Sequence, residues 1–307
     1  MRILSKLAFK NAGDFIGGNA RGLERSIFND RFASGCDDEV LRELKKYQNI
    51  DGGFGNALES DFRLPLSSPM STSKAFEIIR GHEDSSLALP MTIAGIKYFE
   101  ATYDHGRLGW YAVPKEVNEY PHAFWWTYDE ETKMTMIDNS WGNPSADIIG
   151  IIYRHREHST VLDISSLVVH AIEYFKAKKG YDSQHEVYCY ISLQDSLPDK
   201  LAKSLDGPLT RAVGEQVCYD MKKWDTYEPR PLDYVGSPEH RHYGIPPEKI
   251  DINLDYIARE LEVDGHISPH WDTSGYGEGL REAIIEWEGV LTLRALIALD
   301  NFKRIEK

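Results

Sequence analysis

Apolar residues recur along the chain with the spacing of helices that bury one face. Within 252–263 they follow the period of an amphipathic α-helix, at i, i+3, i+4 and i+7: Leu254, Ile257, Ala258 and Leu261. The segment 283–299 is apolar on almost its whole circumference, which indicates a helix buried on most sides. The pattern therefore predicts an all-α fold.

Helices of two kinds are predicted to alternate. The amphipathic set is expected at 37–48, 88–103, 164–178, 200–222 and 252–263. The more apolar set is expected at 20–29, 69–81, 144–157, 184–195 and 283–299. An inner ring of the apolar set, covered by the amphipathic set, would form an α/α toroid of about five to six helical hairpins. An open solenoid is the all-α alternative, but its hairpins keep a tighter period than the uneven spacing found here.

A glycine turn ends the first amphipathic helix. Residues 48–55 read Gln-Asn-Ile-Asp-Gly-Gly-Phe-Gly. Gly52 and Gly53 permit the positive φ that stops a helix, and Gln48 is predicted to bond the last carbonyls of that helix. Phe54 is predicted to fill the gap between neighbouring hairpins. A second copy at 261–267 and weaker copies at 103–110, 179–181 and 223–225 indicate a repeat fold.

Two serine- or asparagine-proline pairs are predicted to begin helices. Ser68-Pro69 and Asn143-Pro144 have the form of an N-cap followed by a proline at the first helical position. The acidic pair Asp37 and Asp38 is expected at a helix start, where the positive end of the helix dipole stabilises carboxylates. These pairs place the first turns of three predicted helices.

The turn at 48–55, followed by the Pro/Ser/Thr-rich segment 65–75, resembles the repeat of the terpenoid cyclase and protein prenyltransferase superfamily. That resemblance implies a squalene-cyclase-like α/α toroid over most of the chain, with a central hydrophobic cavity that receives isoprenoid chains in relatives. The Asp-x-Asp-Asp acid of class II cyclases, the Asp-x-Cys zinc pair of prenyltransferases and the Cys-His-Gly stretch of lanthionine cyclases do not occur. We therefore expect neither cofactor nor metal.

Composition limits the possible partners and compartments. The 307 residues contain 41% hydrophobic residues and no Pro/Gly/Ser linker, so a single domain over 1–307 with a sizeable core is expected. A formal net charge of -14 argues against nucleic acid as a partner. No apolar run is long enough to span a membrane and no signal peptide is evident, so a cytoplasmic protein is expected. The oligomeric state is left open.

Three carboxylates are candidate proton donors. Glu59 and Asp61 are close enough in sequence for one carboxylate to raise the pKa of the other. The alternative is that they belong to a solvated acidic loop or form an ion pair with Arg63. Asp147 stands in an isoleucine-rich helix, where it either caps the first turn or projects into the central cavity of the toroid. All three are predicted catalytic residues if the protein is an enzyme.

Aromatic residues are unusually dense between 110 and 128. We expect Trp110, His122, Trp125 and Trp126, together with Trp287, to line a ligand pocket; packing of a folded-back insertion is the alternative. The histidines of two short segments permit a metal interpretation without a defined zinc spacing, and the sequence does not decide it: His240, His242, His266 and His270.

The favoured functional hypothesis is a central cavity that binds a hydrophobic, isoprenoid-like small molecule, with acid catalysis as its possible reaction. A carbohydrate-active toroid enzyme with paired carboxylates, a glycoside hydrolase or lyase, is one alternative. A binding or scaffold protein without activity is the other. Fold resemblance does not choose among them.

Overall fold

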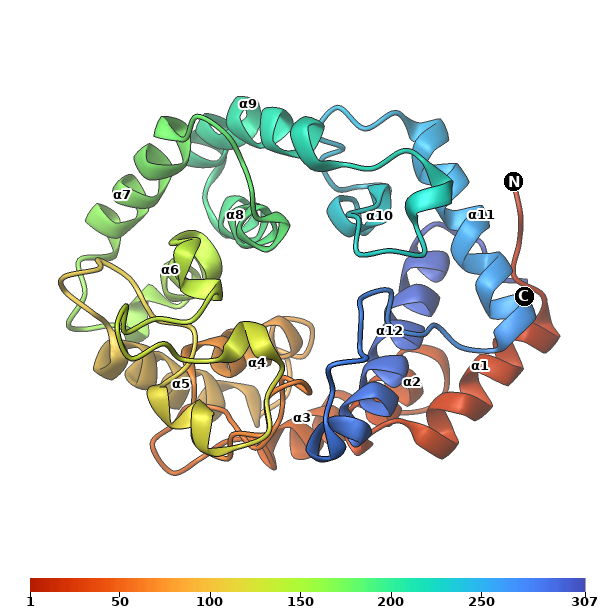
Figure 1. Ribbon diagram of the computed structural model, residues 1–307, viewed down its shortest axis with the longest axis horizontal. Helices are drawn as coiled ribbons and strands as arrows, with labels where there is room; N and C mark the ends of the chain where they lie inside the picture. Colours follow the sequence, from red (N-terminus) through yellow and green to blue (C-terminus); the bar gives the residue numbers. More distant parts are fainter. Residues whose placement is uncertain (307) are drawn as a thin grey trace. The chain divides into compact units, whose positions relative to one another are not determined.

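The computed structural model describes residues 1–306 and is all-α (Figure 1). Across these residues there are 12 α-helices and no β-strand beyond isolated bridges. In chain order the helices are α1 (Lys6–Asn19), α2 (Gly22–Phe32), α3 (Asp37–Lys45), α4 (Pro69–Ile79), α5 (Ala88–Thr102), α6 (Gly142–Arg154), α7 (Ile164–Ala177), α8 (Gln184–Ser196), α9 (Asp199–Gln216), α10 (Pro231–Tyr234), α11 (Pro247–Asp264) and α12 (Arg281–Asn301). The predicted all-α class is confirmed.

Every helix predicted from the sequence overlaps an observed one, and α1 and α10 are additional. The largest boundary error is at α9, which was expected to reach residue 222 but ends at Gln216. The chain leaves the helix there because the Cys218 N–H donates to the carbonyl of Pro229 (2.8 Å). Within the described part of the chain, no helix combines the length and apolar character needed to cross a bilayer.

The helices fall into two compact units. Unit 1 comprises 1–36, 213–275 and 281–306, and unit 2 comprises Asp37–Ala212 and Tyr276–Leu280. The expectation of a single domain remains a prediction, and each unit is described by itself.

The centre of unit 2 is α6, which packs on α4, α7 and α8. Every residue from Gly142 to Ile152 is buried, because α6 has neighbours on several sides. Glycine permits the approach of α8: a Cβ on Gly150 would lie 3.0 Å from the Leu193 Cα. Asn143 keeps a non-helical backbone (φ -105°) ahead of Pro144, and no side chain caps the helix, so the predicted asparagine cap is wrong in its side-chain contact.

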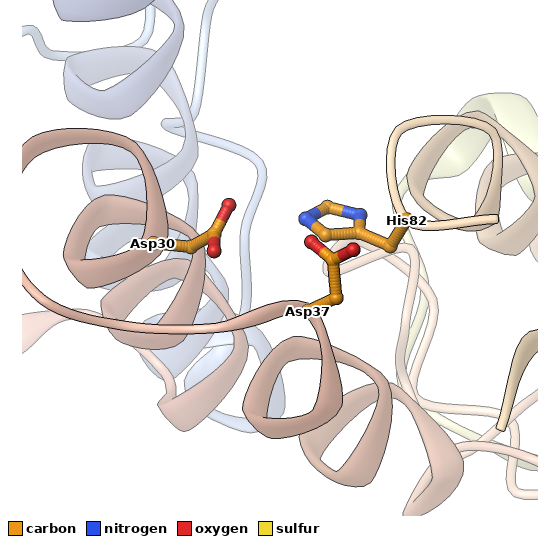
Figure 2. A group of neighbouring side chains, drawn as sticks. All are labelled: Asp30, Asp37 and His82. Atoms are coloured by element: carbon orange, nitrogen blue, oxygen red, sulfur yellow. The ribbon is translucent and has the colours of Figure 1, made fainter. Parts of the chain in front are cut away.

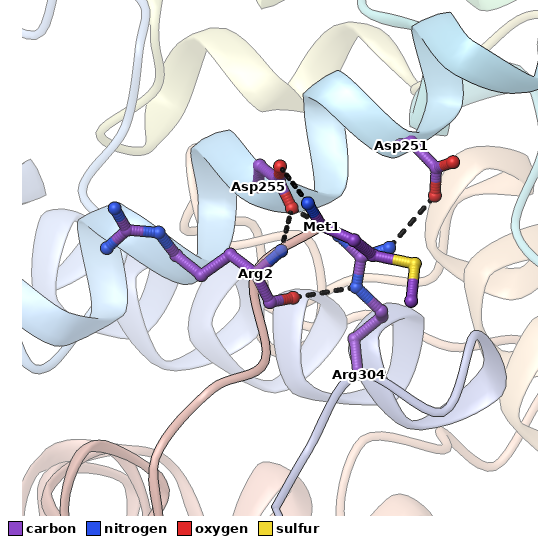
Figure 3. A network of polar contacts seen from close by, with 5 residues as sticks. All are labelled: Met1, Arg2, Asp251, Asp255 and Arg304. Atoms are coloured by element: carbon purple, nitrogen blue, oxygen red, sulfur yellow. Dashed lines mark hydrogen bonds and ion pairs between the residues drawn. The ribbon is translucent and has the colours of Figure 1, made fainter.

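In unit 1, α12 packs on α1, α2 and α11. The first residues of the chain are held against the last ones through Arg304, a buried residue (Figure 3). Its Nε donates to the carbonyl of Arg2 (2.7 Å), and its two terminal nitrogens donate to Asp251 and Asp255 of α11. Arg304 thereby joins both chain ends to α11.

The glycine turn at 48–55 has the predicted conformation. Gly52 adopts φ 91°, and a Cβ there would lie 2.4 Å from the Ala94 carbonyl oxygen of α5. Phe54 is fully buried. Gln48 does not bond the last carbonyls of its own helix: its Nε2 donates to Gly52 O (2.9 Å) and Met91 O (3.4 Å). The glutamine therefore joins the turn to α5, because the helix end is already closed by backbone bonds such as Tyr47 N to Leu44 O (3.0 Å).

The same hydrogen bond recurs in three copies of the turn. The backbone N–H of Phe54 donates to the Thr72 hydroxyl of α4 (2.9 Å). The N–H of Trp110 donates to the Ser145 hydroxyl of α6 (2.9 Å), and that of Ile267 to the Thr292 hydroxyl of α12 (2.9 Å). In each copy the apolar residue after the turn is thus fixed to a hydroxyl on a later apolar helix. This geometry supports the repeat interpretation in both units.

The hydroxyl of Thr72 should contribute measurably to stability. Thr72→Val keeps the shape but leaves the Phe54 N–H buried without an acceptor, which costs about 1–3 kcal/mol. Urea unfolding followed by circular dichroism would measure this loss. Thr210→Val on the exposed face of α9 is the matched control and should stay within about 0.5 kcal/mol of wild type. Equal stabilities for the two variants would contradict a role for the repeated bond.

Ser68 and Pro69 begin α4 as predicted. The Ser68 hydroxyl accepts a hydrogen bond from the Ser71 N–H (3.0 Å), and Pro69 is the first helical residue. Asp37 and Asp38 occupy the first turn of α3, also as predicted.

Candidate functional site

Asp61 lies on the segment between the first glycine turn and α4, where a second segment runs beside it. The Arg63 N–H donates to Pro121 O (2.8 Å) and the Ala123 N–H donates to Asp61 O (2.8 Å). This pairing brings the carboxyl group into the aromatic part of 120–128. Asp61 is only 4% exposed.

Two side-chain donors hold the Asp61 carboxyl group. Trp126 Nε1 donates to Oδ1 (3.0 Å), and the Tyr276 hydroxyl donates to Oδ2 (3.3 Å). Both oxygens are therefore oriented by aromatic residues from separate segments of unit 2. A carboxyl group fixed in this way keeps one orientation toward a bound molecule.

Aromatic rings surround the acid. The ring of Phe62 packs edge-on against Trp126, with ring centroids 4.8 Å apart. The ring centroids of Trp125 and Tyr276 are 6.2 Å apart. Trp126 is buried and Trp125 is half-buried. We call Asp61, Phe62, Trp125, Trp126 and Tyr276 the Asp61 cluster. The exposed ring of Phe124 continues it to the surface, 5.0 Å from Trp125.

The environment changes the acidity of Asp61. Burial, followed by the negative charge of Glu59, raises the pKa of Asp61 to about 7, while hydrogen bonds from Trp126 and Tyr276 oppose the shift. A carboxylic acid with a pKa near neutrality can both donate and accept a proton at working pH. The Asp61 cluster therefore has the chemistry of a general acid or base.

Most of the predicted site residues gather at this cluster. Glu59 acts on Asp61 through its charge, and Trp125 and Trp126 belong to the cluster itself. His122 pairs with Phe62 through the backbone, but its ring bonds its own loop, at Tyr120 O (2.7 Å) and the Thr127 hydroxyl (3.1 Å). His122 thus orders the loop that carries the two tryptophans.

Trp110 lies in the core of unit 2. It is fully buried, its indole N–H donates to Phe99 O (2.8 Å), and its ring packs edge-on against Phe99 and Tyr103. Every polar atom of the residue has a protein partner, so Trp110 packs the repeat turn as Phe54 does. We leave it out of the candidate site.

Asp147 belongs to a second acidic site in unit 2. Its Oδ1 accepts a hydrogen bond from the Ser192 hydroxyl of α8, and the residue lines a cavity of about 170 Å³. Asp147 therefore faces a pocket between α4, α6 and α8, and its projection into a central cavity remains a prediction. Burial, followed by the charge of Glu77, raises the pKa of Asp147 to about 6, against the effects of Ser192, Lys74 and Ser73.

Trp287 lies on α12 in unit 1, edge-on to Trp271 with ring centroids 5.2 Å apart. Tyr227 extends the aromatic group, with its centroid 5.8 Å from Trp271. The indole N–H of Trp287 is buried without a hydrogen-bond partner. A buried donor of this kind is costly, so it is a position where a ligand or water acceptor would be stabilised.

Two further ionisable residues of unit 1 were not singled out from the sequence. Burial raises the pKa of Glu260 to about 7, against the attraction of Arg230, whose Nη1 lies 3.7 Å from Oε2. Arg230 in turn lies over the Tyr256 ring at 5.1 Å. The sequence feature that could have indicated burial of Glu260 is its position three residues after Ile257, next to the apolar face of the helix.

Two of the four histidines left open by the sequence have surroundings that the structure defines, His266 and His270. His266 stacks on Phe15 at 4.5 Å and lies 3.6 Å from Glu288. Burial, followed by Arg230, lowers the pKa of His270 to about 4, so this ring is neutral at pH 7. Among the described residues, the groups of potential ligand atoms close enough to hold one ion include none of the four.

Asp37 and His82 of unit 2 do lie beside each other, with ligand atoms within 4.8 Å (Figure 2). His82 Nδ1 is already within 2.8 Å of Ile78 O. Asp30, also drawn in Figure 2, belongs to unit 1. Two side chains within one unit are too few for a structural metal centre.

Comparison of the chain with models of protein families, with curated proteins and with solved structures gave no significant match.

Proposed function

We propose that this chain is an enzyme that protonates a hydrophobic, isoprenoid-like small molecule from Asp61. The observation that carries the proposal is the Asp61 carboxyl group, buried among aromatic rings and oriented by Trp126 and Tyr276. A pKa of about 7 leaves a substantial protonated fraction at neutral pH. Glu59 would assist by raising the proton affinity of Asp61, and Asp147 remains a second candidate donor.

The aromatic rings suit the expected intermediate. Protonation of an isoprene double bond gives a carbocation, which is attracted to the faces of tryptophan, tyrosine and phenylalanine. Tyr276 bonds the acid and Trp125 lies against Tyr276, so these two rings would provide those faces. A substrate that covers these two half-buried rings would exclude water from the acid and so protect the cation from early capture.

The architecture proposed with this function is an α/α toroid of the terpenoid cyclase kind. It is supported by the glycine turn at 48–55 and by the three backbone N–H to hydroxyl bonds that follow copies of that turn. Alternation of amphipathic and apolar helices supports it as well. The cavity would then be central and apolar.

Deuterium incorporation tests the reaction. The purified protein would be incubated in heavy water with farnesol, geranylgeraniol and squalene, and the products analysed by mass spectrometry. Protonation by the enzyme should add a single non-exchanging deuterium to the carbon skeleton. Asp61→Asn keeps the shape and should abolish incorporation, while Asp129→Asn in an exposed loop should not. Incorporation by Asp61→Asn at the wild-type rate would contradict Asp61 as the donor.

A carbohydrate-active enzyme is the second candidate, because Glu59 and Asp61 are two interacting carboxyl groups and half-buried Trp125 belongs to the same cluster as Asp61. Glycoside hydrolases use a pair of carboxyl groups for catalysis, and aromatic side chains can stack on the sugar rings. Release of reducing sugar from a panel of oligosaccharides, lost in Asp61→Asn, would favour this candidate. Bound ligand without turnover of either class would favour a binding protein.

A further inference from the structure

The two oxygens of the Asp61 carboxyl group have hydrogen-bond partners of different kinds. Oδ1 accepts from the indole Nε1 of Trp126 (3.0 Å), and Oδ2 accepts from the hydroxyl group of Tyr276 (3.3 Å). An indole N–H can only donate, whereas a hydroxyl group can donate one hydrogen bond and accept others. The two partners therefore respond differently when Asp61 takes up a proton.

Protonation of Asp61 makes its two oxygens unequal. One becomes a carbonyl oxygen, which accepts hydrogen bonds, and the other becomes a hydroxyl group, which donates one. Trp126 is only 5% exposed, so its N–H needs an acceptor in both ionisation states, and the carbonyl oxygen is the better acceptor. The hydroxyl group of Tyr276 can rotate and accept a hydrogen bond from the protonated oxygen. The stronger set of hydrogen bonds is therefore obtained with the proton on Oδ2.

The surroundings of the two oxygens also differ in exposure. On the Oδ1 side, Trp126 packs edge-on against Phe62, and both rings are buried. On the Oδ2 side, Tyr276 and Trp125 are half-buried, and Trp125 packs against Phe124, which is 67% exposed. Aromatic contacts therefore lead from Oδ2 to the surface of unit 2 and from Oδ1 into its core.

We propose that Asp61 carries its transferable proton on Oδ2 and delivers it on the side of Tyr276, with Trp126 as a positioning residue that holds Oδ1 as the carbonyl oxygen. This inference rests on the proposed role of Asp61 as the proton donor. In the transfer step the Oδ2–H bond breaks and its electron pair stays on Oδ2, while the π electrons of the substrate form the new C–H bond. The hydroxyl group of Tyr276 then donates to the carboxylate that remains.

The position of the proton determines where the substrate lies. With delivery from Oδ2, the reacting double bond lies next to Tyr276 and Trp125, so the carbocation forms beside two aromatic faces. Delivery from Oδ1 would place the double bond at Trp126 and Phe62, which are buried and packed against each other. The substrate therefore contacts the half-buried rings of the cluster.

Isotope-edited infrared spectroscopy of the full chain tests the proposal without a substrate. Aspartate labelled with ¹³C at Cγ separates the carboxyl bands of aspartate from the band of Glu59, and the band of protonated Asp61 is the one that Asp61→Asn lacks. At pH 5, below the pKa of about 7, Asp61 should be protonated. The wavenumber of its C=O stretch reports whether the carbonyl oxygen accepts a hydrogen bond, because such a bond lowers it.

Two variants remove one hydrogen bond each. Trp126→benzothienylalanine, in which a sulfur atom takes the place of the indole N–H, keeps the shape and should raise the wavenumber of the Asp61 C=O stretch. Tyr276→Phe should leave that wavenumber unchanged, because Tyr276 contacts the hydroxyl oxygen. Trp125→Phe is the matched control and should also leave it unchanged, because Asp61 bonds Trp126 and Tyr276.

The same spectra separate failure of this inference from failure of the proposed reaction. A shift caused by Tyr276→Phe and not by loss of the Trp126 N–H would place the proton on Oδ1 and overturn the inference alone. Equal shifts in both variants, or none in either, would show that Trp126 does not hold Oδ1 as the carbonyl oxygen and would also overturn it. Absence of the Asp61 band at pH 5 would show an ionised carboxylate and contradict the proposed reaction as well.

Discussion

Phe54→Ala is expected to lower the free energy of unfolding by about 3–5 kcal/mol, the usual cost of truncating a fully buried phenylalanine. Phe54 joins two helical hairpins of unit 2, since its backbone pairs with Gln48 on one side and with Ser68 on the other. The truncated side chain would leave a cavity that these backbone bonds prevent from collapsing. Urea unfolding followed by circular dichroism and by tryptophan fluorescence would measure the loss.

The matched control for this prediction is Phe124→Ala. That ring is 67% exposed, so its removal should change the stability by no more than about 0.5 kcal/mol. Binding of any ligand at the cavity of Asp147 should survive Phe54→Ala, because Phe54 does not line it. If the two phenylalanine variants unfold at the same urea concentration, the glycine turn does not hold the hairpins together.

The spacing of apolar residues predicted most of the helices, because that spacing is visible within each helical segment alone. The period of 252–263 is one example, and α11 covers that range. Helix α1 was missed because two of its three buried positions are alanines, Ala8 and Ala12, which give little contrast with their neighbours. Helix α10 was missed because its four residues are too few to show a period.

Contacts between segments were predicted less well. Gln48 was predicted to bond carbonyls of its own helix, whereas its side-chain amide reaches the carbonyl of Met91, 43 residues away. A side-chain amide can satisfy any nearby carbonyl, and which carbonyl is near depends on how the hairpins pack. The same limit applies to Trp110, whose aromatic character does not reveal whether its ring faces a pocket or the core.

The sequence predicted those residues of the candidate site that lie on two loops. Glu59 and Asp61 on one loop and Trp125 and Trp126 on the other were each conspicuous by residue type. Tyr276 completes the cluster from 215 residues beyond Asp61, and nothing near it in sequence marks that contact. The acidity of Asp61 follows from burial, which only the folded chain provides.

Asp61→Asn is expected to make the protein more stable than wild type at pH 8 but not at pH 4. The folded-state pKa of Asp61 is about 7, above its ordinary value of 3.8, so the folded state retains a proton that the unfolded state has lost between these values. Wild-type stability therefore falls as pH rises through this window. The shift corresponds to at most about 4 kcal/mol at pH 8, at about 1.36 kcal/mol per pKa unit.

Asparagine avoids this cost because it is neutral at every pH. Its Oδ1 can still accept from Trp126, and its amide can donate to the Tyr276 hydroxyl. Urea unfolding of both proteins at intervals from pH 4 to pH 8 gives the difference directly. The titration of Asp147 and Glu260 occurs in both proteins and cancels from that difference, provided that the substitution leaves their surroundings unchanged.

The exposed Asp129 provides a control in which the pH dependence of the folding stability has the opposite sign. Hydrogen bonds from Thr132 lower the pKa of Asp129, so its carboxylate stabilises the folded state above its ordinary pKa and loses that effect as pH falls. Asp129→Asn should accordingly be less stable than wild type at neutral pH and approach wild type in acid. A stability difference for Asp61→Asn that stays constant from pH 4 to pH 8 would show that Asp61 is ionised in the folded protein, and the proposed proton donor would have to be sought elsewhere.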